Sequence, residues 1–330
     1  MRTLHKSCKY FNEQFPVDLR TIGRCDSPLI VDNSPPVAGT VNDGEIYGLD
    51  LDFTRYEDKI CSNWQSFYDP QSGIAMYMVG VGSSPNQTDV ANLTRFSSKS
   101  HVACVELKPD KYLSHNQKYF TTVYAYNGGH KQQNVSAISN GVLVDLTKPV
   151  PGQIVDGNSV NFTDMKYTTS QAKVDLQWKS FFDPESNISH YDVKVYRAGN
   201  LSQDYEEIRD WTKFDASTSS VKWLNFHNYH KDIIKTSLRT TNRALNEIVN
   251  TTDGFIVDLT PPQLHYLWDG DQEKDREFQS DISQLTASFK YTDKESGVDH
   301  IKLEIFEMFH GTRTQKYPGN CHYLSMWSIF

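Results

Sequence analysis

Hydrophobic and polar residues alternate along several short stretches of the chain, and a period of two residues is the pattern of a half-buried β-strand. The stretch 74–81 alternates in this way, and the stretches 191–195 and 301–305 repeat the same parity. A later stretch, 119–127, has a counterpart at 234–242. These stretches contain many β-branched and aromatic residues, as strands do. No window of about 12 residues carries an apolar stripe with the helical period, so we expect an all-β fold.

Three sequence landmarks recur along the chain with a nearly constant spacing. The first is an Asp-Gly pair and the second is an aspartate that closes a strand-like segment, and successive members of each lie 113 residues apart. Their members are Gly44, Gly157 and Gly270, and Asp32, Asp145 and Asp258. The third landmark begins at Trp64 and at Trp178, and a degenerate copy begins at Phe289. Independent landmarks that keep one period indicate a tandem array of similar units.

The period divides the chain into two complete units, 35–148 and 149–261, and two partial ones. Residues 1–34 carry only the closing mark of a preceding unit, and residues 262–330 are shorter than one period. A partial unit cannot bury its own apolar face. We therefore expect the sequence to be a fragment of a longer protein, truncated at both ends.

Large aromatic residues stand at fixed places in the predicted strands of each unit. Trp64 and Trp178 occupy equivalent positions, and Phe289 takes that place in the third unit. Burying a large aromatic side chain between two sheets removes roughly 150–250 Å² from water, so such residues anchor a core. The residues that we expect in the cores are Trp64, Trp178, Phe289, Tyr77, Tyr191 and Tyr119. Short strands separated by turns, at roughly 100 residues per unit, indicate β-sandwiches.

The first complete unit resembles a fibronectin type III module. The residues that carry the resemblance are Trp64, Tyr77, Leu113, Tyr119, Val123, Ala125 and Asn127. The spacing from Leu113 to Tyr119 is similar to the tyrosine corner of that family, whereas the second unit has Ile234 where the corner tyrosine belongs. The resemblance covers residues 35–261, and 262–330 more weakly. It implies tandem immunoglobulin-like β-sandwiches, arranged as beads on a string, from a metazoan-type extracellular protein.

Composition narrows the classes of partner. The chain has 330 residues, with 33 Lys+Arg against 41 Asp+Glu and a formal net charge of −8. This balance argues against nucleic acid or an anionic membrane surface as the main partner, because both require a basic footprint. No run of about 18 apolar residues is present, so we expect no membrane insertion within this segment. The first twenty residues lack the apolar core of a secretory signal, so the chain is either cytosolic or a piece of a longer protein.

Two cysteines of the first complete unit are placed to form a disulfide. Cys61 lies three residues from the inward Trp64 and therefore faces outward, and Cys104 faces outward if Ala103 faces the core. The pair is either a bridge across one sheet or two free thiols, and both remain open from the sequence. The second unit has Asp175 in place of Cys61, so the fold does not require a bridge. The other cysteines are Cys8 and Cys25, a weaker candidate pair, and the odd Cys321.

Asn-x-Ser/Thr sequons bear on the compartment. The candidate glycosylation sites are Asn86, Asn92, Asn134, Asn161, Asn187, Asn200 and Asn250. All seven fall within the two complete units, in predicted loops or at strand edges, where a bulky glycan is tolerated. Together with the cysteines they favour an extracellular or cell-surface protein.

No motif for catalysis is present. His227 and His230 lack a further metal ligand at a useful spacing, and the acidic residues Glu206, Glu207 and Asp210 are typical of a solvated loop. The common nucleophile, phosphate-binding and zinc motifs are absent from the sequence. A single active site would not require repeated copies of one module. We therefore expect no enzyme, no cofactor and no metal.

The boundaries between successive units suggest one hypothesis for a metal site. Asp145 could pair with Asp156, and Asp258 with Asp269, to hold Ca²⁺ as in cadherin-like rods. Only two recurrent carboxylates are available at each junction, whereas Ca²⁺ takes six or more oxygens. We therefore favour a turn-capping role for these aspartates.

The sequence favours a non-catalytic extracellular spacer and protein-recognition segment, with other extracellular or membrane proteins as partners. Outward Phe120, Tyr124 and Tyr126 are the candidate binding face, although packing or glycan cover explains them equally well. The alternatives are a carbohydrate-binding or accessory module of a secreted enzyme whose catalytic domain lies elsewhere, and an intracellular scaffold.

Overall fold

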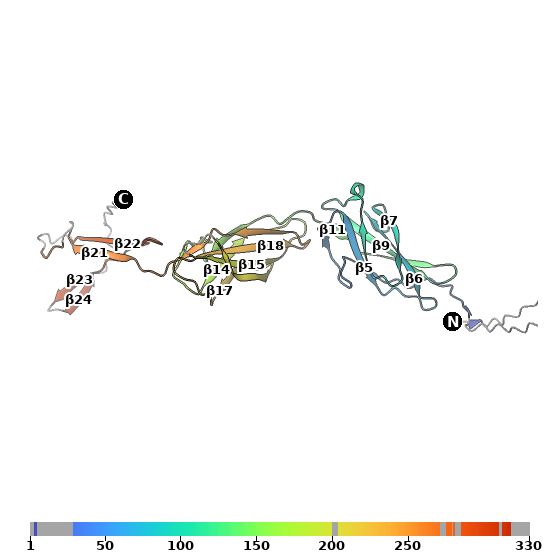
Figure 1. Ribbon diagram of the computed structural model, residues 1–330, viewed down its shortest axis with the longest axis horizontal. Coiled ribbons are helices and arrows are strands. Elements are labelled where there is room, and N and C mark those ends of the chain that lie inside the picture. Colours follow the sequence, from blue (N-terminus) through green and yellow to red (C-terminus); the bar gives the residue numbers. More distant parts are fainter. Residues whose placement is uncertain are drawn as a thin grey trace, which may run out of the picture.

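Two β-sandwiches and a smaller set of strands follow one another along the long axis of the molecule (Figure 1). The computed structural model describes residues 3–4, 29–199, 204–270, 275–278, 280, 285–309 and 312–317. Of residues 3–4, 29–30, 305–309 and 312–317 only the backbone is described. The sequence candidates outside the described residues are Cys8, Cys25, Asn200 and Cys321. We call the strands β3 to β11 the first repeat, β12 to β20 the second repeat, and β21 to β24 the third unit.

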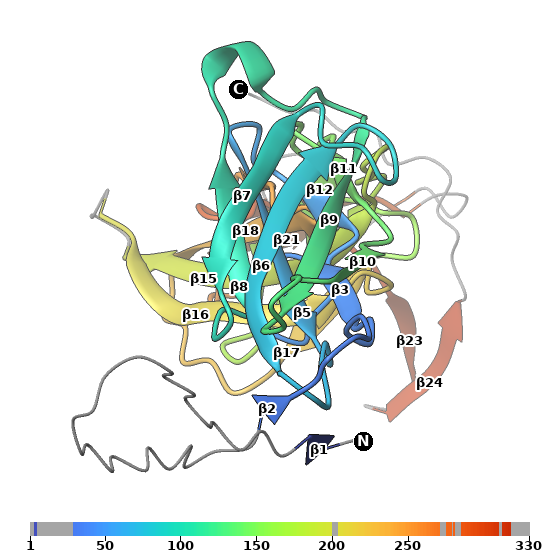
Figure 2. The ribbon, with the colours of Figure 1, turned by 90° about the vertical axis from the view of Figure 1, so that its right-hand side faces the viewer.

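The first repeat consists of a three-stranded and a six-stranded sheet. The smaller sheet has the order β3 (Thr40–Asp43), β5 (Lys59–Gln65), β8 (Val102–Glu106). The larger has the order β4 (Phe53–Thr54), β11 (Val142–Val144), β9 (Lys118–Asn127), β6 (Ile74–Gly82), β7 (Ala91–Ser97), and β10 (Asn134–Ile138) also pairs with β9. A 3-10 turn, Pro109–Lys111, lies between β8 and β9. Figure 2 looks along the molecule onto this repeat and shows β6, β7 and β9 side by side.

The second repeat has the same strand order. Its smaller sheet contains β12 (Gln153–Asp156), β14 (Val174–Lys179) and β17 (Ser220–Trp223). Its larger sheet has the order β13 (Tyr167–Thr168), β20 (Phe255–Val257), β18 (Ile233–Asn242), β15 (Ile188–Ala198), β16 (Glu206–Asp215), with β19 (Glu247–Thr251) on β18. Two sandwiches with one topology confirm the predicted all-β fold class of tandem sandwiches.

The alternation in the sequence decides which face of each strand is buried. Tyr77 and Val79 of β6 pair with Ala125 and Val123 of β9, and all four side chains point into the core. Residues that stand opposite each other on paired strands point to the same face of the sheet. The alternation of buried and exposed residues along β6 therefore also determines which residues of β9 are buried.

Each sandwich buries one tryptophan between its sheets in the same surroundings. Trp64 of β5 and Trp178 of β14 are 0 % and 2 % exposed. Their rings lie 5.3 Å from the rings of Tyr77 and Tyr191, respectively, centroid to centroid. Tyr119 of β9 is buried in a second cluster at the other end of the first repeat. The aromatic residues thus bridge the two sheets in both repeats.

The third unit differs from the sequence-based expectation in two respects. Among the described residues, β21 (Gln263–Asp269) pairs only with β22 (Ala287–Thr292), and β23 (Ile305–Phe309) only with β24 (Thr312–Tyr317). Phe289 is therefore half-buried rather than enclosed between two sheets. The predicted start of the strand over 301–305 was wrong: β23 begins at Ile305, and residues 301–304 pair with no strand in the part of the chain that the structure describes. At the other end, β1 (Thr3–Leu4) pairs with β2 (Leu29–Ile30).

Candidate functional site

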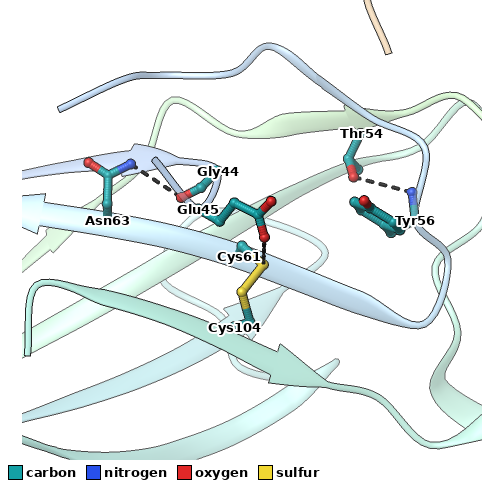
Figure 3. Close-up of a disulfide and its surroundings, with 7 residues drawn as sticks. All are labelled: Gly44, Glu45, Thr54, Tyr56, Cys61, Asn63 and Cys104. Atoms are coloured by element: carbon teal, nitrogen blue, oxygen red, sulfur yellow. Dashed lines mark hydrogen bonds between the residues drawn. A yellow bond between two sulfur atoms is a disulfide. The ribbon is translucent and has the colours of Figure 1, made fainter. Parts of the chain in front are cut away.

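A disulfide joins β5 and β8, two of the three strands of the smaller sheet of the first repeat (Figure 3). Cys61 of β5 and Cys104 of β8 stand directly opposite each other and are separated by 43 residues in sequence. Of the two alternatives left open by the sequence, the structure has the bridge. It lies on the face opposite to Trp64, so it ties the strands together without disturbing the core.

On the same outer side, Asn63 organises the loop that follows β3 (Figure 3). Its side-chain amide donates to the carbonyl oxygens of Gly44 and Leu49 at 3.2 and 2.8 Å, and its carbonyl oxygen accepts the Gly48 N–H at 3.0 Å. Asn63 is fully buried. Sequence reasoning missed this residue, because an asparagine within a strand carries no local signal for a loop 14 to 19 residues away.

The junction between the two repeats is held by four polar residues, which we call the junction clamp: Asp145, Asp183, Ser186 and Asn242. The Asn242 amide donates to Asp145 Oδ2 at 2.9 Å, to Asp183 Oδ2 at 3.0 Å and to the carbonyl oxygen of Thr147 at 3.2 Å. Ser186 donates to Asp145 Oδ2 at 2.6 Å. The linker aspartate is thereby fixed to the end of β18 and to the turn before β15, both in the second repeat.

The same clamp recurs where the preceding segment meets the first repeat. The Asn127 amide donates to Asp32 Oδ2 at 2.9 Å, to the Ser34 carbonyl at 3.0 Å and to Asp69 Oδ2 at 3.5 Å, and Ser72 also donates to Asp32. At the junction to the third unit, Asp258 Oδ2 accepts the Ser296 hydroxyl at 2.7 Å, and Asp293 Oδ1 accepts the Ser296 N–H at 2.9 Å. The hydrogen bond from serine to the linker aspartate therefore recurs at all three junctions, and the one from asparagine is present at the first two. The sequence period located the linker aspartates, but not the asparagines that bind them.

Two direct contacts between the repeats flank this clamp. Arg243 Nη2 lies 2.5 Å from Asp52 Oδ2, and the guanidinium stands 4.7 Å from the centre of the Phe53 ring. Arg55 donates to the carbonyl oxygen of Leu245 at 2.9 Å. These contacts join the β4 side of the first repeat to the loop between β18 and β19 of the second.

The calcium pairing considered for the junction is wrong. Asp145 lies with Asp183 at the linker, whereas Asp156 closes β12 beside Asp164 and Asp253. Asp145 accepts hydrogen bonds from protein donors on both oxygens, which is the turn-capping role that we favoured. In the second cluster Lys166 forms ion pairs with Asp164 and Asp253, with its Nζ 2.6 and 2.5 Å from their carboxylate oxygens.

The recurrent Asp-Gly landmark places a buried carboxyl in each repeat. Asp43 and Asp156 are both 0 % exposed. Neither oxygen of Asp43 and only one oxygen of Asp156 has a hydrogen-bond partner. Burial raises the pKa of Asp43 to about 7 and that of Asp156 to about 7, and the nearby carboxylates Asp50 and Asp164 add to the effect.

The sequons and the aromatic stripe lie mostly on the surface. The asparagines with exposed side chains are Asn86, Asn92, Asn134, Asn161 and Asn187. Asn250 is half-buried on β19, and its side-chain oxygen is enclosed. On the outer face of β9 the stripe of Phe120, Tyr124 and Tyr126 is half-buried, and Tyr126 stands opposite Asn134.

The acidic residues predicted to form a solvated loop lie instead on β16, so that expectation was wrong. Glu207 and Asp210 lie 2.6 and 3.1 Å from Nζ of Lys194 on the neighbouring β15. Glu206 pairs with Arg197 of β15 at 3.0 Å. Cross-strand ion pairs make this acidic run compatible with a strand.

The corner that precedes β9 differs chemically from its counterpart before β18. In the first repeat the Tyr119 hydroxyl accepts the Ser114 N–H at 3.0 Å, as expected for a tyrosine corner. In the second repeat Asp232 accepts the Tyr229 N–H at 2.7 Å in its place. Asn228 is 2 % exposed, and neither polar atom of its side chain has a hydrogen-bond partner.

A half-open pocket of about 290 Å³ lies beside Asn228. The residues that line it are Gln171, Ala172, Phe226, His227, Asn228 and Tyr229. The neighbouring His230 is separate from His227 in role, since its Nδ1 accepts the Leu259 N–H at 3.2 Å at the junction to the third unit. Among the described residues, His230 lies together with Asp258 and Glu295, and His227 is not part of that group.

No protein-family model matches the chain, and no curated protein matches it in sequence. Among solved structures it is similar to the FN1-FN3 domains of chicken CNTN1, with a TM-score of 0.37 and 11 % identity over 68 % of this chain and 70 % of that chain. The described residues contain no helix long and apolar enough to cross a membrane. By its own strand order, the chain is a tandem of all-β sandwiches of the fibronectin type III-like kind.

Proposed function

We propose that the chain is a non-catalytic, extracellular spacer and protein-recognition segment of a larger secreted or cell-surface protein of metazoan type. The observation that carries this proposal is the junction clamp. A linker of a few residues whose aspartate is bound on both oxygens restricts the angle between neighbouring sandwiches. A chain of modules held in this way separates its ends by a defined distance, which is what a spacer requires.

The disulfide and the sequons support the extracellular part of the proposal. Disulfides persist in oxidising compartments, and five sequon asparagines are exposed to an incoming glycan. We propose that residues 35–148 and 149–261 are the two complete repeats, with 1–34 and 262–330 belonging to neighbouring ones. The aromatic stripe of β9 is the proposed contact surface for other extracellular or membrane proteins.

Small-angle X-ray scattering of the Asn242→Ala variant tests the spacer role. Loss of the amide removes three hydrogen bonds at the junction, and we expect a broader distribution of interatomic distances than for the parent chain. Asn140→Ala is the matched control, because Asn140 donates only within the first repeat, to Asp50 at 2.9 Å. Equal distributions for both variants and the parent would contradict the spacer role.

The compartment is tested on protein secreted from animal cells. The intact mass should fall after treatment with a glycosidase that removes N-linked glycans, and Cys61 and Cys104 should appear as one disulfide-linked peptide pair under non-reducing conditions. An unchanged mass together with two free thiols would favour the intracellular scaffold instead.

The pocket beside Asn228 favours a second candidate function, carbohydrate binding. Sugar hydroxyls both donate and accept hydrogen bonds, as the unpartnered amide of Asn228 requires, and the exposed Tyr229 ring offers an apolar face. Saturation-transfer NMR with glucose, galactose, mannose and N-acetylglucosamine tests this candidate. Binding should be lost in Asn228→Leu and retained in Val249→Ala, a control on exposed β19. Absence of transfer from all four sugars would remove the candidate.

A further inference from the structure

The outer face of the larger sheet of the first repeat carries two rows of apolar side chains. Tyr124 and Tyr126 of β9 stand opposite Met78 and Met76 of β6, and all four are half-buried. Ala125, between the two tyrosines, is fully buried in the core, so the tyrosines and the methionines point away from the core. An apolar patch on the outside of a sandwich is a surface that another group is suited to cover.

The strand β10 lies on the side of β9 away from β6 and carries a glycosylation sequon on the same face. Asn134 stands opposite Tyr126, and Ser136, the third residue of the sequon, stands opposite Tyr124. The Asn134 side chain is exposed. Side chains directly opposite each other on antiparallel strands have Cβ atoms about 4.5–5.5 Å apart. The first sugar of a glycan on Asn134 is therefore within reach of the Tyr126 ring.

The second repeat provides a comparison at the same places of its larger sheet. Asn242 ends β18 as Asn127 ends β9, and both bind a linker aspartate. Counted back from these asparagines, Thr241 and Arg239 take the places of the two tyrosines. This face of the second repeat therefore has no aromatic ring at either of the two places.

The corresponding face of the second repeat is charged instead. Arg239 Nη2 lies 3.1 Å from Asp192 Oδ2 on β15, and its Nε lies 3.6 Å from Glu247 Oε2 on β19. Asp192 and Glu247 take the places of Met78 and Asn134, respectively. A face of paired charges is well solvated and requires no cover. The apolar side chains and the glycosylation site thus occur together in the first repeat, and both are replaced in the second.

We propose that an N-linked glycan on Asn134 packs its first N-acetylglucosamine against Tyr126 and Tyr124 and thereby closes the contact surface on β9. This inference rests on the proposed function, because it requires an extracellular chain and assigns the control of the contact surface proposed above. One face of the sugar ring presents mainly C–H groups, which pack on an aromatic ring as other apolar groups do. The contact removes apolar area of the tyrosines from water, so the glycan should also stabilise the first repeat. The contact surface is then open only on chains that lack this glycan.

Nitration of tyrosines by tetranitromethane, mapped by mass spectrometry, measures access to this surface. The full chain is secreted from animal cells, and its glycans are trimmed enzymatically to a single N-acetylglucosamine. The nitration rates at Tyr124 and Tyr126 should rise several-fold in Asn134→Gln. Asn92→Gln is the matched control, because it removes an exposed sequon on β7 of the same sheet and should leave both rates unchanged. Tyr47, which is 57 % exposed, is the internal reference.

A double-mutant cycle tests whether the sugar and the tyrosine ring interact. Tyr126→Thr installs the residue that the second repeat has at this place. In the parent background, Asn134→Gln should raise the unfolding equilibrium constant of the first repeat, measured by native-state hydrogen exchange, about fivefold, which is the size of one aromatic contact. In the Tyr126→Thr background, Asn134→Gln should have no effect on that constant.

The possible outcomes separate this proposal from the proposed function. Glycans on other sequons together with an unmodified Asn134 would overturn this proposal alone. An occupied Asn134 with unchanged nitration rates in Asn134→Gln, or with the same stability effect in both backgrounds, would do the same. Secreted chains without a glycan on any sequon would overturn both this proposal and the extracellular role.

Discussion

Replacing Asp43 with asparagine should change how the stability of the first repeat depends on pH. Asp43 closes β3 and is fully buried without a hydrogen-bond partner for its carboxyl. Burial raises the pKa of Asp43 from 3.8 to about 7, and the negative charge of Asp50 also raises it. The nearby Ser139, Gly141 and Lys118 offset part of this rise.

The sign follows from proton binding. The folded repeat holds the Asp43 proton more tightly than the unfolded chain, so the stability from this group is complete below pH 3.8 and is lost as the pH rises to about 7. One pKa unit corresponds to about 1.4 kcal/mol, so the loss across this range is about 4 kcal/mol at most. The Asp43→Asn variant has no titrating group at this place and avoids the loss. Its first repeat should therefore gain stability relative to the parent as the pH rises from 4 to 7.

Native-state hydrogen exchange measured by mass spectrometry gives the free energy of unfolding for each repeat separately. Peptides from β5 and β9 report the first repeat, and peptides from β14 and β18 serve as the internal control. Asp156→Asn is the matched variant, because the pKa of Asp156 is also about 7 and its effect should be confined to the second repeat. An Asp43→Asn variant whose first repeat loses stability in parallel with the parent between pH 4 and 7 would refute the reasoning.

Three further predictions concern stability and the junction. Replacing Cys61 and Cys104 with alanine opens a link across 43 residues and should destabilise the first repeat by about 4 kcal/mol on the chain-entropy estimate; equal exchange rates in the parent and the variant would contradict this. Trp178→Ala should cost the second repeat about 3–5 kcal/mol and leave peptides of the first repeat unchanged, and a cost below about 1 kcal/mol would show that the indole does not anchor the core. Arg243→Ala should change the free energy of unfolding by less than about 1 kcal/mol, because its ion pair with Asp52 is exposed. It should nevertheless broaden the distribution of interatomic distances measured by X-ray scattering. An unchanged distribution would show that the junction clamp alone restrains the two repeats.

The sequence was sufficient to predict where most strands lie and which face of them is buried. The parity around Trp64 placed Cys61 on the outside, and the register of β5 and β8 then brought Cys104 opposite to it. The sequence did not predict that the acidic residues of β16 form a strand. The basic residues that pair with them belong to the neighbouring strand β15, and the local sequence does not show that pairing. It also mispaired Asp145 with Asp156, which follows it closely in sequence but lies in a different cluster.

The sequence by itself determined the all-β class, the repeated unit and the buried faces of its strands. These properties depend on the alternation of hydrophobic and polar residues and on landmarks that each segment carries within a few residues. They are therefore encoded locally and do not depend on contacts between distant segments. Only the tertiary structure decided the chemistry of the junctions. Asn242 reaches Asp145 across 97 residues and Asp183 across 59, and His115 meets Glu185 only because the linker brings two modules together. Such contacts arise from how the strands pack, and the spacing of residues along the chain does not specify them.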